Sequence, residues 1–251
     1  MVDFLPPQRT FSAGEFARMA QDTIREIQSR GKLPVVTGGA GLYIKALTEG
    51  IFSGDSRDPI IRRKLEEEYD ACGGDLMIQR LWELDPEYAQ IVHINDRKKL
   101  VRAMEVFCTT GRTISQLAQE QDSSIIDALY VGLTMPREEL YQRINLRVDQ
   151  MLEEGLVEEV RGLKESDLCK KLNSLNSPGY IEIYEYLDGS IDYDTAVELI
   201  KRNTRRYAKR QMTWFRRNNL IHWFDRSRGM DNIIPEIIDL IKSYIYAEET
   251  N

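Results

Sequence analysis

The fold class is indicated by residues 32–47, which read KLPVVTGGAGLYIKAL. The apolar run from Leu33 to Thr37 has the length and composition of a buried strand. The glycine-rich turn at Gly38–Gly41 then leads directly into an apolar helical segment. A helix is also predicted before the strand, because Ser12 and Glu15 can form a capping box ahead of a helical apolar stripe. Helix, strand, turn and helix in this order predict an α/β fold with a parallel sheet.

Composition narrows the classes of protein to which this chain can belong. Of its 251 residues 42% are hydrophobic, and 34 basic against 41 acidic residues give a formal net charge of −7. This balance excludes a uniformly basic nucleic-acid coat, although it permits a local basic site. No apolar run approaches the roughly 20 residues that a membrane span requires, and the first residues lack a signal-peptide pattern. We therefore expect a cytoplasmic protein without a membrane partner.

Cysteine and histidine are too few for several kinds of site. The three cysteines, Cys72, Cys108 and Cys169, lie far apart and cannot all pair within the chain, so reduced thiols are expected. The two histidines, His93 and His222, have no cysteine or histidine neighbour at metal-ligand spacing. A zinc site or a histidine-based triad is therefore not expected, and no residue is assigned as a metal ligand. Any chemistry would depend on carboxylates, arginines and phosphate-binding backbone.

Residues 58–121 differ from the rest of the chain because they are charged and helical in pattern. Helices are predicted there at 60–69, 76–84, 86–91, 96–109 and 113–119. No strand pattern interrupts them, so we interpret 58–121 as an all-helical insertion domain and 1–57 with 122–251 as the α/β core. In the core, strands are predicted at 129–133 and 220–224, and helices at 136–164, 178–187, 193–217 and 232–246.

The strongest local signal is a basic segment, 201–217, which reads KRNTRRYAKRQMTWFRR and contains eight basic residues and no acidic one. On a helix most of these cations fall within an arc of roughly 140°. Ile200, Tyr207, Trp214 and Phe215 fall on the other side, so the helix is predicted to anchor by an aromatic face and to present its cations outward. Such a face favours a polyphosphate or nucleic-acid ligand. The simpler interpretation is a solvated helix whose cations pair with acidic neighbours.

Two arginines further up the chain are candidates for a phosphate contact. On the helix predicted from 136, Arg147 lies at the edge of the apolar stripe and Arg143 lies one turn earlier. An arginine at a buried edge needs a partner, which could be a phosphate or a carboxylate of this chain, and the pattern does not choose between them.

The turn at Gly38–Gly41 also has two possible interpretations, because glycines at such a junction allow either anion binding or close packing. Basic clusters at 62–64 and 97–102 are, taken alone, more typical of a solvated face. No G-x-x-x-x-G-K-[ST] loop and no complete G-x-G-x-x-G motif is present.

Several segments then carry a resemblance to a known family. They are 38–43 (GGAGLY), 93–96 (HIND) with 102–106 (RAMEV), 143–151 (RINLRVDQM), 179–180 (GY) ahead of 186–189 (YLDG), and 209–216 (KRQMTWFR). Together they resemble the tRNA dimethylallyltransferases, also called tRNA isopentenyltransferases. The matches keep the family's order and cover nearly the whole chain, so they are far more specific than any single motif.

The resemblance implies a P-loop-NTPase-like α/β core, N-terminally truncated, with a helical insertion. It implies transfer of a dimethylallyl group from dimethylallyl diphosphate to N6 of the adenosine on the 3′ side of the anticodon, with Mg²⁺ helping to neutralise the diphosphate. Family members begin with a phosphate-binding P-loop and an aspartate that acts as general base. Both precede the position that matches Met1, so no catalytic residue is assigned in this chain.

The resemblance also implies a set of contacts with the tRNA anticodon stem–loop. They are Gly39, Ala40, Arg62, Lys98, Lys99, Arg102, Lys209, Arg210, Gln211, Thr213, Trp214 and Arg216. Position 40 is alanine where the family usually has a channel-lining threonine, and Ile181 stands where a basic residue is usual. Arg143 and Arg147 are assigned to the diphosphate more from helix geometry than from the family.

Three hypotheses follow for the function, all with a monomer expected. The first is that the sequence is part of a longer, active tRNA dimethylallyltransferase in which Met1 is an internal methionine. The second is a tRNA-binding protein of the same family without catalysis. The third is an unrelated α/β protein whose basic helix binds protein partners.

Overall fold

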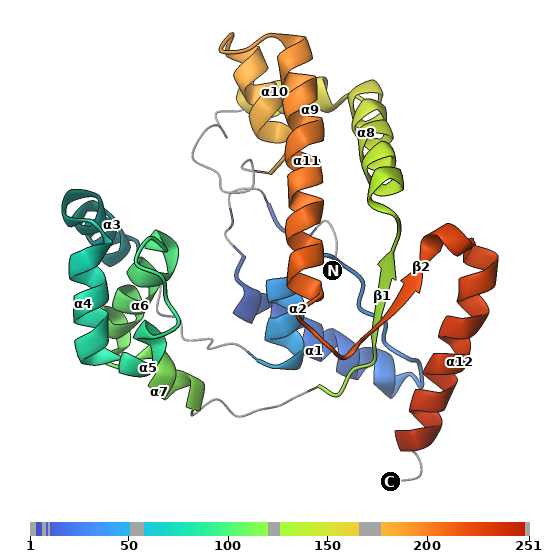
Figure 1. The fold of residues 1–251 in the computed structure, drawn as a ribbon, viewed down its shortest axis with the longest axis horizontal. Coiled ribbons are helices and arrows are strands. Elements are labelled where there is room, and N and C mark those ends of the chain that lie inside the picture. The colour runs from blue at the N-terminus through green and yellow to red at the C-terminus, as the bar shows by residue number, and fades with distance from the viewer. Residues whose placement is uncertain are drawn as a thin grey trace. The chain divides into compact units, whose positions relative to one another are not determined.

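The computed structural model describes residues 4–6, 9, 11–50, 58–119, 126–165 and 177–248 (Figure 1). Contacts divide the chain into two units. One unit comprises Met1–Phe11, Val36–Gly41 and Asp127–Asn251, and the other comprises Ser12–Val35 and Leu42–Ile126. The predicted domain boundaries next to 58 and 122 adjoin residues outside the described ranges, so that division stays a prediction.

The first unit contains a small parallel sheet. Strand β1 (Tyr130–Thr134) pairs with β2 (Ile221–Asp225), in a register that sets Tyr130 opposite Ile221 and Thr134 opposite Asp225 (Figure 1). Gly132 lies opposite Trp223, and a Cβ at this glycine would come within 2.6 Å of the indole ring. The strands predicted at 129–133 and 220–224 are confirmed to within one residue, and they pair in parallel, as expected of the predicted kind of sheet.

The strand predicted at Leu33–Thr37 is wrong. Within the described residues this segment pairs with no strand. Its apolar side chains are exposed instead of buried, with Leu33 54% and Val35 72% accessible. An apolar run becomes a strand only where a neighbour completes its backbone hydrogen bonds, and composition does not report whether that neighbour exists.

Helices α8 to α11 of the first unit share one apolar cluster. They are α8 (Arg137–Glu153), α9 (Leu156–Glu165), α10 (Tyr180–Leu187) and α11 (Tyr193–Phe215), and a 3₁₀ turn, η2 (Arg226–Arg228), then leads to α12 (Met230–Glu248). The cluster consists of Val148, Leu156, Val160, Ile183, Ala196 and Ile200. The single long helix predicted at 136–164 is wrong, because Gly155 takes a φ of +100° between α8 and α9. Glycine adopts this conformation readily, and the chain turns there.

The second unit begins with α1 (Ala13–Ser29), and most of α2 (Gly41–Thr48) belongs to it. The capping box predicted for α1 is confirmed: the Glu15 amide donates to Ser12 Oγ at 3.1 Å, and the Ser12 amide donates to Glu15 Oε2 at 2.9 Å. Buried alanines at 13, 17 and 46 let the two helices pack closely, and the Phe16 ring stacks on Tyr43.

The remaining helices of the second unit have a core of their own. They are α3 (Pro59–Cys72), α4 (Gly74–Leu84), α5 (Pro86–Ala89), α6 (Arg97–Thr110) and α7 (Ile114–Gln119), and each corresponds to a predicted helix. The core consists of Leu65, Met77, Leu81, Ala89, Val92, Leu100, Val101, Ala103 and Met104. In the described parts of the chain, no helix combines the length and the apolar character that crossing a bilayer would require.

Candidate nucleic-acid interface

Helix α11 is fixed at its N-terminal half by its neighbours. Asp192 caps the helix by accepting from the Thr195 amide at 2.7 Å, and this bond keeps the pKa of the Asp192 carboxyl below its usual value. Ile200 is buried in the core cluster. Two polar contacts tie the helix to α8: Lys201 Nζ lies 2.7 Å from Asp149 Oδ1, and Arg205 Nη1 donates to Asn145 Oδ1 at 2.7 Å.

The other cations of α11 and its C-terminal extension are exposed to solvent. They are Arg202, Arg206, Lys209, Arg210, Arg216 and Arg217. None of these six forms an ion pair with a carboxylate of the described residues, whereas Lys201 does. The interpretation of α11 as a helix paired with acidic neighbours therefore holds for one lysine and not for the exposed face. That face is an uncompensated run of positive charge, which suits a polyanion.

The predicted aromatic anchor of α11 is wrong in part. Ile200 is buried as expected, but Tyr207 and Trp214 are 43% and 44% exposed. The helix is held instead by Ala196 and Ile200 in its first half and by polar contacts with α8. The helical spacing correctly predicted an exposed cationic side, but Arg205 from that side contacts α8 and two aromatic residues of the opposite side are exposed.

The glycine turn packs against α11. Gln211 Nε2 donates to the Gly39 carbonyl oxygen at 3.1 Å, across 172 residues of sequence. A Cβ at Gly39 would lie 2.2 Å from Gln211 Nε2, and one at Gly41 would lie 2.2 Å from Trp214 Nε1. Of the two explanations left open for these glycines, close packing is the one that the geometry supports. The turn places the exposed Ala40 next to Gln211 and Trp214, so these predicted site residues come together.

The two arginines assigned to the diphosphate lie on α8. Asn145 and Asp149 on this helix contact α11, and the helical repeat puts Arg143 and Arg147 on the opposite side. Both are exposed; the Arg147 side chain is 61% accessible, and its Nη1 lies 3.4 Å from Glu154 Oε2. The expectation that Arg147 sits at a buried edge is wrong, because its side chain is mostly exposed to solvent. Their role toward a diphosphate stays a prediction.

A second basic cluster lies in the helical part of the other unit, at the start of α6. Asp96 caps this helix by accepting from the Lys99 amide at 3.2 Å, and the Lys98 and Lys99 side chains are exposed. Arg97 makes a two-point contact with Asp70, with Nε–Oδ1 and Nη2–Oδ2 distances of 2.9 and 2.8 Å. This guanidinium holds the pKa of the Asp70 carboxyl below its usual value. The cluster is therefore ordered by ion pairs with α3.

Two more of the predicted site residues meet at one buried carboxylate. Arg62 Nη1 on α3 and Arg102 Nη1 on α6 contact Glu105 Oε2 at 3.1 and 2.8 Å. Arg62 Nε also donates to Glu66 Oε1 at 3.1 Å. The predicted site residues do not include Glu105. Its signal in the sequence is an acid inside the apolar stretch 103–106, where a helix face turns toward the core.

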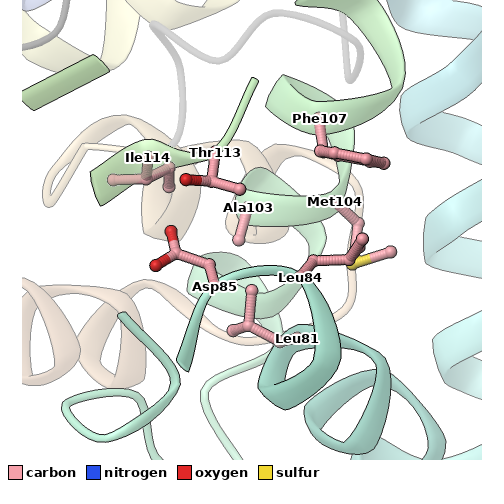
Figure 2. A pocket seen from close by; sticks show the side chains of 8 residues that line it. All are labelled: Leu81, Leu84, Asp85, Ala103, Met104, Phe107, Thr113 and Ile114. Carbon is pink, nitrogen blue, oxygen red and sulfur yellow. The ribbon is translucent and has the colours of Figure 1, made fainter. Parts of the chain in front are cut away.

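The cavity shown in Figure 2 does not provide a ligand site. It lies between α4, α6 and α7, and it has no room for a water molecule. Its lining is mainly apolar: Leu81, Leu84, Asp85, Ala103, Met104, Phe107, Thr113 and Ile114. The Asp85 carboxylate at its wall is already hydrogen-bonded within the protein, since it accepts from the backbone amides of Tyr88 at 3.1 Å and Ser115 at 3.0 Å.

Glu182 on α10 is another buried carboxylate, and it is also absent from the predicted site residues. It is 2% exposed, accepts from the Gly179 amide at 2.7 Å and from Asn203 Nδ2 on α11 at 2.7 Å. It therefore fixes α10 against α11. Over the part of the chain that is described, no group of three or more His, Cys, Asp or Glu side chains is arranged to hold a metal ion.

Comparisons with known proteins give one consistent result. The family model described as IPP transferase matches residues 1–218. A tRNA dimethylallyltransferase 1 from Citrifermentans bemidjiense is 43% identical over 243 residues, covering 96% of this chain and 78% of the relative. A tRNA dimethylallyltransferase from Bacillus cereus strain AH187 is 41% identical over 253 residues, covering 100% of this chain and 79% of the relative.

Solved structures agree with the sequence relatives. The tRNA isopentenylpyrophosphate transferase of Bacillus halodurans superimposes with a TM-score of 0.70 at 37% identity, covering 99% of this chain and 78% of that one. A eukaryotic dimethylallyltransferase, whose structures are described as snapshots of its action on tRNA, gives a TM-score of 0.75 at 25% identity, covering 95% of this chain and 64% of that one.

Proposed function

The chain belongs to the IPP transferase family and modifies tRNA by dimethylallyl transfer. From this premise we propose which of its residues contact the tRNA and which contact the diphosphate. The acceptor in this proposal is N6 of the adenosine on the 3′ side of the anticodon, and the donor is dimethylallyl diphosphate. Strands β1 and β2 would belong to a P-loop-NTPase-like core, which their parallel pairing supports.

The observation that carries the proposal is the exposed cationic face of α11. Six cations, Arg202, Arg206, Lys209, Arg210, Arg216 and Arg217, lack a carboxylate partner among the described residues. Repulsion among so many like charges destabilises a bare helix, and a phosphate backbone relieves it by displacing counterions. We assign this face, with the Gly39–Ala40 turn that Gln211 holds against it, to the anticodon stem–loop. Arg62, Lys98, Lys99 and Arg102 are assigned to the same RNA.

The chemistry defines what the protein has to supply. The C1–O bond of dimethylallyl diphosphate breaks, a bond forms between C1 and adenosine N6, N6 loses a proton, and diphosphate leaves. The adenosine has to leave its stack before N6 is accessible, and the diphosphate needs cations while negative charge develops on it. Arg143 and Arg147 are proposed for that contact, supported by their exposure on α8. None of the described residues is assigned as the general base.

The resemblance also implies Mg²⁺, which would neutralise part of the diphosphate charge. The described residues contain no cluster of metal-ligating side chains that fits it. No residue is therefore assigned to Mg²⁺, and none of the steps above depends on a protein-held ion.

The test is a transfer assay with two tRNAs that differ at one nucleotide. The purified 251-residue chain is incubated with labelled dimethylallyl diphosphate and a tRNA that carries adenosine 3′ of the anticodon, or the same tRNA with guanosine there. Label is expected in the first tRNA only, and digestion followed by mass spectrometry should place it on N6 of that adenosine. Equal labelling of both tRNAs would contradict the assigned acceptor, and no labelling would contradict the activity of this chain.

The comparisons offer no support for the alternative of a catalytically inactive tRNA-binding protein. The sequence relatives described above are named as transferases. The third hypothesis, an unrelated α/β protein, is wrong, because the family model covers residues 1–218.

A further inference from the structure

Glu105 is a fully buried charge in the helical part of the second unit. It lies in the middle of α6, and its side chain is 0% exposed. Oε2 accepts from Arg62 Nη1 and Arg102 Nη1, at 3.1 and 2.8 Å. Oε1 is buried and has no hydrogen-bond partner among the described residues. Half of the acceptor capacity of this carboxylate is therefore unused.

Packing alone does not explain a charge at this position. Its neighbours on α6, from Leu100 to Val106, are almost all buried and apolar, so a leucine or methionine would extend the same core. Burying a carboxylate costs several kcal/mol in typical proteins, and replacing buried ion pairs by apolar residues is often neutral or stabilising. A buried charge with an unsatisfied oxygen is thus better explained by what it holds in place than by stability.

What Glu105 holds is a pair of arginines from two different helices. The Arg62 and Arg102 side chains are 37% and 28% exposed. Each guanidinium group therefore contacts the buried Glu105 carboxylate on one side and solvent on the other. The adjoining first turn of α6 carries Arg97, Lys98 and Lys99 and no acidic residue. Cations are unfavourable at the positive end of a helix dipole. Carboxylates contact most of these cations: Glu105 holds Arg62 and Arg102, Asp70 holds Arg97, and Asp96 holds Lys99. Lys98 forms no ion pair with the described residues, so an anion would contact Lys98 and the exposed edges of the Arg62 and Arg102 guanidinium groups.

We propose that Glu105 is a positioning residue for tRNA, whose buried carboxylate sets Arg62 and Arg102 in the orientation that binds RNA phosphates. The inference rests on the proposed function and deepens it.

The sign of the effect distinguishes this role from simple electrostatics. Glu105→Gln removes one negative charge next to two arginines, and charge alone would then tighten the binding of a polyanion. If Glu105 positions the arginines, the same variant binds tRNA more weakly. We expect the KM for tRNA and the Kd from filter binding to rise about 10-fold. We expect kcat and the KM for dimethylallyl diphosphate to stay within about twofold of wild type.

A double-mutant cycle tests whether Glu105 acts through the arginines. In a chain that carries Arg62→Ala and Arg102→Ala, adding Glu105→Gln should change the Kd for tRNA by less than about twofold. Wild-type or tighter tRNA binding by Glu105→Gln would overturn the proposal. An undiminished loss of about 10-fold in the arginine-free background would overturn it as well.

Asp85→Asn provides the matched control. Asp85 is also a buried carboxylate of the α3–α7 helices, but it accepts from backbone amides and contacts none of the predicted RNA-binding residues. This variant should lower the melting temperature and leave the Kd for tRNA unchanged.

If Glu105→Gln does not fold, Glu105→Asp can replace it in the double-mutant cycle, because aspartate keeps the negative charge and shortens the side chain by one methylene. If wild type binds tRNA without transferring the dimethylallyl group, the proposed activity fails while the Kd measurements still decide the role of Glu105.

Discussion

At the scale of single residues, the glycines of the 38–41 turn differ in whether close packing requires them. Gly39 and Gly41 sit directly against α11, where a Cβ would overlap Gln211 or the Trp214 ring. A Cβ added at Gly38 would meet no other atom within 4 Å. The three glycines therefore differ in what they permit, although they look alike in the sequence.

This difference leads to a prediction for alanine substitutions. Gly41→Ala should lower the free energy of unfolding by about 1–3 kcal/mol, because the rigid indole of Trp214 has to move. Gly38→Ala is the control and should change it by less than about 0.5 kcal/mol. Chemical denaturation followed by tryptophan fluorescence measures both. An equal effect of the two substitutions would contradict the packing seen at Gly41.

Asp85 leads to a prediction about acid stability. Burial alone would raise the pKa of its carboxyl, but hydrogen bonds from Ser115, Tyr88 and Thr113 outweigh burial and leave the pKa below its usual value. A lowered folded-state pKa means that the carboxylate stabilises the fold above its unfolded pKa of about 4. That contribution is lost as the pH falls through the lower, folded pKa.

Asp85→Asn should therefore lower the free energy of unfolding at pH 7 by about 1–3 kcal/mol, because one amide oxygen cannot cap the starts of both α5 and α7. The loss should shrink as the pH falls below about 4, where the wild-type carboxylate is itself neutralised. Urea denaturation at a series of pH values checks this. A loss that is constant with pH would show that the charge of Asp85 does not matter.

Among the secondary-structure elements, α11 has two faces with different tasks. One face is held against α8 by Lys201 and Arg205, and Ile200 contributes to the core. The other face presents the six exposed cations that no described carboxylate neutralises. A helix can separate these tasks because side chains three or four residues apart share one face, while those between them point elsewhere.

The two faces should respond differently to the loss of a cation. Replacing Lys209 and Arg210 together by alanine should weaken tRNA binding and reduce the slope of log K against log salt by roughly 1.4–1.8, the value for two lost phosphate contacts. Lys201→Ala should leave the slope unchanged, because Asp149 already neutralises that lysine, and should lower stability instead. Filter binding at several salt concentrations separates the outcomes. A reduced slope for Lys201→Ala would contradict the division of α11.

In the molecule as a whole, the two units have separate hydrophobic cores. The cluster around Leu100 joins α3–α7, and the cluster around Ile183 joins α8–α11. The two clusters have no residue in common. Each core can therefore lose its packing without directly removing contacts from the other.

Calorimetry should accordingly show more than one unfolding transition. Leu100→Ala and Ile183→Ala each remove a fully buried side chain, and each should cost about 2–5 kcal/mol in its own unit. Leu100→Ala should shift one transition and Ile183→Ala the other. A single transition that both variants lower equally would show that the units unfold together.

Much of this structure follows from local sequence patterns. The capping box at Ser12 predicted the start of α1, the helical pattern of 58–121 predicted α3–α7, and apolar runs predicted the two paired strands. Each of these signals is determined by neighbours a few residues away in the sequence. The long basic helix was predicted for the same reason. The family resemblance, carried by segments distributed along the chain, was confirmed by the comparisons.

The amino-acid sequence alone therefore established the positions of most elements, the cationic character of α11 and the family. Three-dimensional packing settled which glycines meet α11, that Gly155 divides a predicted helix, that Leu33–Thr37 lacks a pairing strand, and that Glu105 joins two arginines. Each of these depends on contacts between residues distant in sequence or on a backbone angle. Such contacts are set by how elements pack against one another, which residue type and spacing do not encode locally.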